Sequence, residues 1–188
     1  MRIKIGVMGA AGGKMSSQAR KKSYLLGKAI AEAGCVTLTG GCPGLPFEST
    51  RGAKEAGGLT IGVSPGLNLQ EHIDLYKSPT EHLDVLIFTG SGLMGREVVG
   101  VRSCDVVVIV GGRSGTLGEF CIAYDEGRPI GVLEGTGGIT TGLKKVVELM
   151  KKKTGSEVIY DADPFRLVKR VLEAHRHMKK KKIRYAAG

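Results

Sequence analysis

The sequence predicts a single α/β domain: a doubly wound, Rossmann-like and mostly parallel sheet of about six or seven strands, with helices on both faces. Short β-rich apolar runs alternate along the chain with longer segments of helical periodicity, the order that right-handed β-α-β crossovers produce. The chain has 30 glycines among its 188 residues, and glycine-rich turns follow several of these runs. With 41% apolar but only 5% aromatic residues, the core consists of Val, Ile, Leu and Ala, which is typical of a parallel sheet between helices.

The first half of the chain alternates four apolar runs with helical or polar segments. IKIGVM is followed by the turn GAAGG and by a segment whose apolar residues recur at helical spacing until Gly34 stops it. VTLT is rich in β-branched residues, which favour a strand. Two glycines close the helix that follows it, and Pro65 ends the next apolar run, LTIGVSP. The elements expected here are strands at residues 3–8, 36–39, 59–65 and 85–90, helices at 16–33 and 48–58, and a loop with a short helix across 66–84.

The second half contains DVVVIV, the most apolar run and therefore the most deeply buried strand expected. GLMGREVVGVRS before it is expected to be helical despite its glycines, and Ser114 is placed to cap the helix after it. Asp163 as N-cap, with Pro164 at the first position, starts the last helix. The elements expected here are strands at residues 105–110, 129–134 and 157–160 and helices at 92–103, 115–127, 140–153 and 163–180.

The net charge of +10 is concentrated at one end of the chain. Residues 176–184 supply six of these charges, which leaves +4 for the rest. We expect residues 1–175 to form the Rossmann-like domain and residues 176–188 a basic C-terminal tail, solvated and partly frayed. An anion-binding or RNA-associated role for the tail is a weaker alternative, because no aromatic residues alternate with its lysines as platforms for stacked bases.

The cysteines and the apolar runs indicate the compartment. No pair among the four cysteines has C-x-x-C spacing, so neither a metal site nor a redox motif is predicted. No apolar run reaches transmembrane length, and the first residues do not form a signal peptide. We therefore expect a cytoplasmic protein with no membrane partner.

Three further polar residues have no strong functional pattern. His72 and His82 lie in the polar crossing segment without a partner at metal-ligand or triad spacing, so both are expected in loop or surface positions. Arg51 is either a solvated charge on its short helix or a residue that reaches a ligand.

Four glycine-rich turns follow strands: GAAGG, TGGCPG, TGSGLMGRE and GGRSGTLGE. In doubly wound sheets the ligand binds beyond the carboxyl ends of the strands, where glycine N–H groups and helix N-termini approach an anion. Gly9, Gly40 and Gly41 are therefore candidate phosphate- or nucleotide-binding residues. The dinucleotide fingerprint G-x-G-x-x-G and the Walker pattern are absent, which disfavours a conventional NAD site or an NTPase.

The stretches GGCPGLPFESTRGAKEAGGLTIGVSP and DVVVIVGGRSGTLGE, with Arg96 between them, resemble a known superfamily. It holds the Lonely Guy cytokinin-activating phosphoribohydrolases and the molybdenum cofactor carrier proteins, and its members are often labelled "possible lysine decarboxylase". The resemblance covers roughly residues 3–150 and implies a homodimer or larger homo-oligomer. No lysine lies in a recognisable pyridoxal phosphate setting, so the decarboxylase label has no support in the residues.

The resemblance to the phosphoribohydrolases implies which residues form the site. Their signature is PGGxGTxxE, and an Arg lies upstream, nine residues before the Asp that opens the preceding strand. Arg96 lies nine residues before Asp105, and Glu119 ends the signature, so these two take the catalytic positions. The resemblance implies that the 5′-phosphate is cradled by Gly112, Ser114, Gly115 and Thr116, with Arg113 between them.

The chemistry of Arg96 and Glu119 fits glycosidic cleavage without the resemblance. A ribosyl C–N bond breaks through an oxocarbenium-like transition state. A carboxylate near the anomeric carbon can stabilise this positive charge, or it can position or activate the attacking water. Arg96 can bind phosphate, or pair with Glu119 and keep it ionised. The plainer alternatives are that Glu119 is a first-turn acid placed by the helix macrodipole and that Arg96 is a surface cation or an ion-pair partner.

Two functions therefore compete. The leading expectation is a nucleotide-binding protein that hydrolyses a nucleoside 5′-monophosphate to free base and ribose 5-phosphate, with no required cofactor and no metal. The sequence departs from the phosphoribohydrolase signature in three ways. Gly111 replaces the family's Pro, Arg113 replaces its second Gly, and no His or Lys surrounds Arg96. These departures bring the sequence closer to the carrier-like branch. The alternative is thus a non-enzymatic carrier of molybdenum cofactor or a similar phosphorylated ligand.

Overall fold

The structure is a computed structural model that describes the backbone of residues 1–186 and the side chains of residues 1–178. Seven parallel strands form one sheet in the order β4-β3-β2-β1-β5-β6-β7. The direction of winding reverses between β1 and β5, so the predicted doubly wound fold is confirmed. The strands are β1 (Lys4–Gly9), β2 (Val36–Thr39), β3 (Leu59–Ser64), β4 (Val85–Phe88), β5 (Val106–Val110), β6 (Ile130–Leu133) and β7 (Val158–Asp161).

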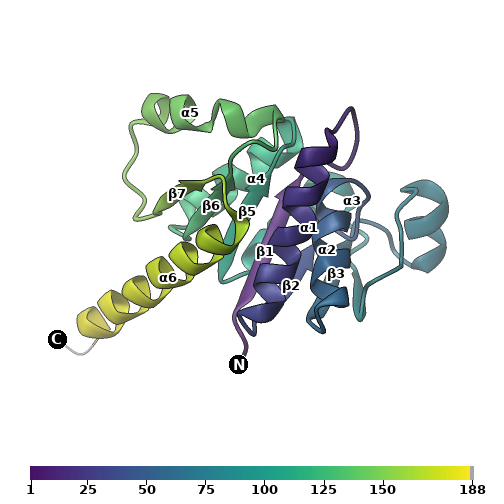
Figure 1. Ribbon diagram of the computed structural model, residues 1–188, viewed down its shortest axis with the longest axis horizontal. Helices are drawn as coiled ribbons and strands as arrows, with labels where there is room; N and C mark the ends of the chain where they lie inside the picture. Colours follow the sequence, from purple (N-terminus) through teal and green to yellow (C-terminus); the bar gives the residue numbers. More distant parts are fainter. Residues whose placement is uncertain (187–188) are drawn as a thin grey trace.

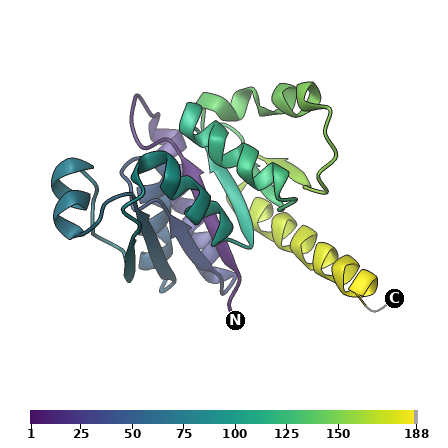
Figure 2. The same cartoon turned by 180° about the vertical axis from the view of Figure 1, so that it is seen from behind.

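Helices cover both faces of the sheet. The face seen in Figure 1 carries α1 (Ser17–Glu32), α2 (Leu45–Glu55) and α6 (Pro164–Ala186). The opposite face, seen in Figure 2, carries α3 (Gly92–Arg102), α4 (Ser114–Asp125) and α5 (Leu143–Met150). Two shorter helices span Glu71–Leu75 and Gly138–Thr141.

The alternation of side chains along β5 produces the two halves of the core. Val106, Val108 and Val110 pack with α1 and α6, whereas Val107 and Ile109 pack with α3 and α4. All five side chains are fully buried, as expected for a central strand covered on both faces. The run predicted to be the most deeply buried strand is thus buried at every residue, as are β2 and β6.

Most predicted elements end within a few residues of the observed ones, and the last helix differs most. The Arg166 N–H donates to Asp163 Oδ1 at 2.8 Å, so the predicted N-cap is confirmed. α6 continues through Ala186, which makes the backbone of residues 176–186 helical. The side chains beyond Met178 and residues 187–188 lie outside the described part, so the solvated tail stays a prediction.

The crossing segment between β3 and β4 extends away from the sheet edge, at the right of Figure 1, and His72 anchors it. The His72 side chain is fully buried, so its predicted loop or surface position is wrong. Its Nε2 lies 3.0 Å from the Pro79 carbonyl oxygen, which can only accept, and therefore donates to it. Nδ1 then accepts from the Ser64 hydroxyl at 2.9 Å, which ties the segment to the end of β3.

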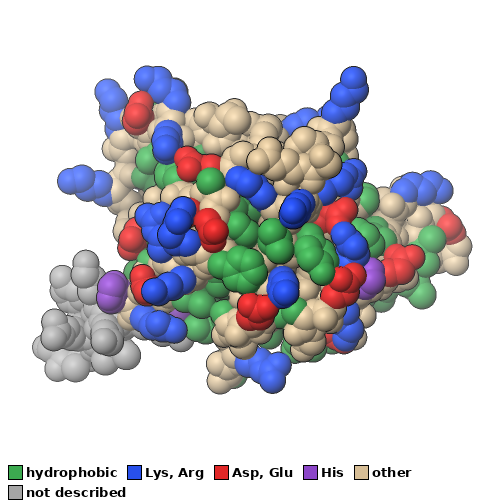
Figure 3. Space-filling view, viewed as in Figure 1, with side chains coloured by type: hydrophobic (Ala, Val, Ile, Leu, Met, Phe, Trp, Pro, Cys, Tyr) green, Lys and Arg blue, Asp and Glu red, His purple; other side chains and the backbone are tan. Residues whose placement is uncertain are grey.

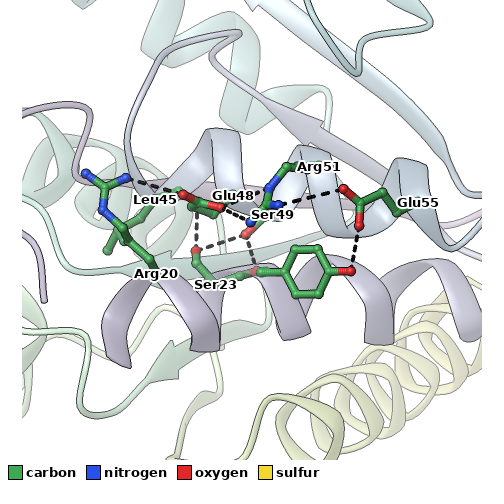
Figure 4. Close-up of polar contacts among 8 residues, drawn as sticks. Arg20, Ser23, Leu45, Glu48, Ser49, Arg51 and Glu55 are labelled. Atoms are coloured by element: carbon green, nitrogen blue, oxygen red, sulfur yellow. Dashed lines mark hydrogen bonds and ion pairs between the residues drawn. The ribbon is translucent and has the colours of Figure 1, made fainter. Parts of the chain in front are cut away.

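Helices α1 and α2 touch backbone to backbone, and polar side chains cross the contact (Figure 4). A Cβ on Gly27 would lie 1.8 Å from the Ser49 carbonyl oxygen, so only glycine fits there. The Ser23 hydroxyl donates to the Leu45 carbonyl and the Ser49 hydroxyl to the Ser23 carbonyl, each at 2.8 Å. The close contact therefore satisfies both buried hydroxyls.

Charged side chains surround this contact on the outer surface. Arg51 donates to Glu48 at 2.8 Å and lies over the Tyr24 ring, so this arginine belongs to the α1–α2 contact. It does not line the candidate pocket below. On the same face, basic and acidic side chains are interspersed among the described residues (Figure 3).

Candidate functional site

A pocket of about 370 Å³ opens at the carboxyl ends of β1 and β5, where the strand order reverses. Its volume lies within the range of small-molecule sites, and its place is where doubly wound sheets bind ligands. The lining residues come from the end of β1 and the turn after it, the turn after β2, the start of α2, α3 and the first turns of α4. Those that the sequence predicted are Gly9, Gly40, Arg96, Arg113, Ser114, Gly115, Thr116 and Glu119.

A second hollow of about 410 Å³ adjoins this pocket and shares six lining residues with it: Ala11, Gly12, Gly40, Cys42, Leu93 and Arg96. Its far side is formed by the crossing segment between β3 and β4, at Leu75, Tyr76 and Ser78. The two hollows together give a ligand room to extend from β5 toward β3.

The turn after β5 is shaped by Gly111 and Gly112, whose φ angles are +58° and +96°. The Gly111 N–H donates to Thr136 Oγ1 and the Ile139 N–H donates to the Gly112 carbonyl, each at 2.9 Å, so the loop after β6 holds the turn. A Cβ on Gly112 would lie 2.3 Å from Thr116 Oγ1. Gly112 therefore shapes the turn but does not line the pocket, where the resemblance had placed it against phosphate.

The first turn of α4 faces the pocket. Arg113 is the N-cap residue and Ser114 the first helical residue, so the predicted capping role of Ser114 is wrong. The first intrahelical bond runs from the Leu117 N–H to the Arg113 carbonyl. The N–H groups of residues 114–116 are thus without helical partners, and with the positive helix end they form an anion-binding geometry.

Arg96 and Glu119 are brought together at the base of the pocket. Arg96 Nη1 lies 4.0 Å from Glu119 Oε1, and the two residues are 9% and 6% exposed. Arg96 is therefore not a surface cation. The helix macrodipole would favour an acid in the first turn of α4, but Glu119 lies beyond that turn. Arg96 Nε is buried and has no hydrogen-bond partner among the described residues.

Burial raises the pKa of Glu119 to about 7, although Arg96 opposes this rise and Glu97 adds to it. Of the two roles that the sequence left open for Arg96, the pairing with Glu119 is present, and it favours the ionised form without outweighing burial. A long ion pair offsets only part of the cost of burying a carboxylate. Near neutral pH both forms of Glu119 are populated, which suits a group that accepts and returns a proton.

The other predicted glycines have different structural reasons. A Cβ on Gly9 would lie 2.1 Å from the Val110 carbonyl oxygen, so this glycine lets β1 approach β5. A Cβ on Gly40 would lie 1.8 Å from Arg96 Nη1, so that glycine makes room for the guanidinium. Gly41 has a φ of +60° beside the ring of His72 and lies outside the pocket lining.

Glu97 is a lining residue that sequence reasoning missed. It directly follows Arg96 on α3, is 7% exposed and lies against the start of α4. Burial raises the pKa of its carboxyl, and Arg96 opposes this rise. Its proximity to Arg96 in the sequence was the available signal, but only the packing of α3 on α4 places it in the pocket.

Cys42 also lines the pocket, and burial raises the pKa of its thiol to about 11. It is therefore a neutral thiol at neutral pH. The four cysteines are free, and no cluster of His, Cys, Asp and Glu with the geometry of a metal site occurs in the described part of the chain. Nor does any helix of that part have the length and apolar composition to cross a membrane.

Comparison with known proteins gives a consistent result. A model of the SLOG cluster4 family matches residues 2–168. An uncharacterized protein from Archaeoglobus fulgidus is 35% identical over 132 residues, which are 70% of this chain and 80% of that protein.

Two solved structures are similar over nearly their whole length. The X-ray structure of TM1055 has a TM-score of 0.78 and 28% identity, and the match covers 91% of this chain and 98% of that one. The Moco carrier protein from Chlamydomonas reinhardtii has a TM-score of 0.74 and 31% identity, with 92% and 99% of the two chains covered.

Proposed function

The chain belongs to the SLOG cluster4 family, and we propose that it binds a phosphorylated, nucleotide-like ligand in the pocket between β1 and β5. The family and the similar structures agree with the superfamily that the glycine-rich stretches resemble. The free N–H groups at the start of α4 provide an anion site, and Arg96 and Arg113 add positive charge to its lining. The adjoining hollow leaves room for the rest of the ligand.

Hydrolysis of a nucleoside 5′-monophosphate to base and ribose 5-phosphate is the function that this geometry supports best. The buried Arg96–Glu119 pair beside the anion site carries this proposal. With phosphate at α4, ionised Glu119 takes a proton from the water that attacks the anomeric carbon. The electron pair of the C–N bond leaves with the base, which is then protonated. A carboxyl with a pKa of about 7 can serve in both proton transfers.

Carriage of molybdenum cofactor or a related phosphorylated ligand is the second candidate. It is supported by the similarity to the carrier protein of Chlamydomonas reinhardtii. Arg113, which stands where the phosphoribohydrolases have glycine, lines the pocket and is exposed, so it can hold a phosphate without taking part in bond cleavage. A carrier needs the same anion site but no proton transfer at Glu119.

A release assay separates the two functions. Purified protein is incubated with AMP, other common nucleoside monophosphates and N6-modified AMP, and free base is measured by chromatography. Hydrolysis predicts that base is released and that Glu119→Gln lowers the rate by about 100-fold or more while ligand binding is kept. The matched control Glu148→Gln changes an exposed glutamate on α5 and should keep the full rate. No release from any of these substrates, with a pterin phosphate bound unaltered, would support carriage instead.

We also propose that two or more copies of the chain assemble, as the superfamily resemblance implies. Exposed apolar side chains gather on the edge strand β4 and on α3: Val85, Ile87, Phe88, Leu93, Met94 and Val99. Several exposed apolar side chains on an edge strand and on the helix that follows it favour a protein contact. Because Leu93 also lines both hollows, a second copy on this surface would lie close to the ligand.

A further inference from the structure

Glu97 is a buried carboxyl whose surroundings provide no hydrogen bond. It is 7% exposed, and it makes neither a hydrogen bond nor an ion pair with another residue in the part of the chain that the structure describes. Its neighbour on α3, Arg96, instead forms its ion pair with Glu119. The Glu97 oxygens are not among the fully buried polar atoms without a partner, so they are accessible from the pocket, and a group that reaches them there meets a strong hydrogen-bond acceptor.

Two glycines of α4 make room for this carboxyl. A Cβ on Gly115 would lie 2.9 Å from Glu97 Oε1, and a Cβ on Gly118 would lie 3.0 Å from Oε2. Gly115 belongs to the anion-binding turn, whereas Gly118 directly precedes Glu119. The Glu97 carboxyl therefore lies against the first two turns of α4, of which the first forms the anion site and the second carries Glu119, and it lines the same pocket as both.

The part of a nucleoside 5′-monophosphate that lies between its phosphate and its glycosidic bond is the ribose. An ionised carboxylate is a pure acceptor, so it repels phosphate but accepts from two adjacent hydroxyls. We propose that Glu97 is a specificity-determining residue that accepts hydrogen bonds from the 2′- and 3′-hydroxyls of the ribose. This inference rests on the proposed nucleotide ligand and adds a preference for ribose over deoxyribose.

The test compares the dissociation constants of AMP, 2′-deoxyAMP and 3′-deoxyAMP, measured by isothermal titration calorimetry with free base assayed after each titration. The wild type should bind AMP about tenfold or more tightly than at least one of the deoxy analogues. Glu97→Gln should reduce this ratio and Glu97→Ala should remove it. Glu148→Gln, the same change on the surface of α5, should leave the ratio as in the wild type.

Each other outcome has a distinct meaning. Equal affinities of the wild type for the three nucleotides would overturn the role of Glu97 even if its variants did not fold, and would leave nucleotide binding standing. An unchanged ratio in both Glu97 variants would do the same. Tight binding of a pterin phosphate without binding of AMP would overturn the ribose contact but keep a phosphorylated ligand. Binding of neither compound would overturn both proposals.

Discussion

The guanidinium of Arg96 lies directly against the backbone of Gly40, where a Cβ would approach Nη1 to 1.8 Å. The turn after β2 thus sets the position of a side chain on α3, which follows two strands later in the chain. Since Gly40 does not have a positive φ, alanine is compatible with its backbone. The atom in the way is the end of a flexible side chain, so the substitution displaces the guanidinium rather than the strand.

We therefore expect Gly40→Ala to weaken binding of AMP by about tenfold or more, because displacement breaks the hydrogen bonds of Arg96 to a bound anion. Its free energy of unfolding should change by only about 1 kcal/mol. Calorimetric titration and urea denaturation measure the two effects. Gly100→Ala on α3 is the matched control, because the nearest atom to its new Cβ is Met8 Cε at 3.8 Å. Wild-type affinity in Gly40→Ala would show that the position of Arg96 does not matter for the ligand.

The raised pKa of Glu119 predicts a pH-dependent stability. The folded chain holds the proton up to about pH 7, whereas the unfolded chain loses it near pH 4.5. The native state binds more protons in this range, so the contribution of Glu119 to the free energy of unfolding falls as pH rises from 4.5 to 7.

Glu119→Gln mimics the protonated form and should lack this loss. Relative to the wild type, the variant should gain about 2 to 3 kcal/mol in free energy of unfolding between pH 5 and pH 8. Urea titrations of both proteins at the two pH values give the difference directly. A constant difference would show that the pKa of Glu119 is close to its ordinary value.

The fold could be predicted because its signals are local. β2 lies at the predicted residues 36–39, and the run of five valine and isoleucine residues after Asp105 is the buried strand β5. Apolar runs and the glycines or prolines that end them are short-range patterns. The Arg96–Glu119 pair was found through the resemblance, which had already connected two distant positions.

What the sequence left open depends on partners that are far apart in the chain. A glycine in the sequence does not tell which atom fills the space of its missing side chain. Gly40 makes room for Arg96 and Gly115 makes room for Glu97, and neither reason was part of the prediction that both glycines bind phosphate. His72 was placed in a loop for the same reason, because its partner Ser64 belongs to a strand. Such roles appear only once the helices are packed on the sheet.

The exposed apolar surface of α3 and β4 predicts how copies of the chain meet. Met94 is 71% exposed and does not line the pocket, so Met94→Glu should convert the proposed oligomer to a monomer by placing a charge in the proposed contact. Size-exclusion chromatography with light scattering gives the mass. Leu149→Glu, at a 67% exposed apolar side chain on α5, is the control and should keep the wild-type mass. An unchanged oligomer in Met94→Glu would place the contact elsewhere.

The contact of α1 with α2 predicts a large effect from a small substitution. Alanine normally stabilises a helix relative to glycine by roughly 0.5 to 1 kcal/mol. In Gly27→Ala the new Cβ would instead meet the Ser49 carbonyl oxygen at 1.8 Å, and a backbone atom cannot move aside cheaply. The helices must separate, which breaks the hydrogen bonds of the Ser23 and Ser49 hydroxyls (Figure 4).

We expect Gly27→Ala to lower the free energy of unfolding by about 2 to 4 kcal/mol, since overpacking and buried unsatisfied hydroxyls add. Urea denaturation measures the loss. Gly100→Ala, also within a helix but with space around its Cβ, should be neutral or stabilising. Opposite signs of the change in free energy of unfolding for the two substitutions would then show that α1 and α2 are in close contact at residue 27. Equal stability of the two variants would mean that a Cβ at residue 27 does not meet the Ser49 carbonyl oxygen and that the two helices are not in backbone contact there.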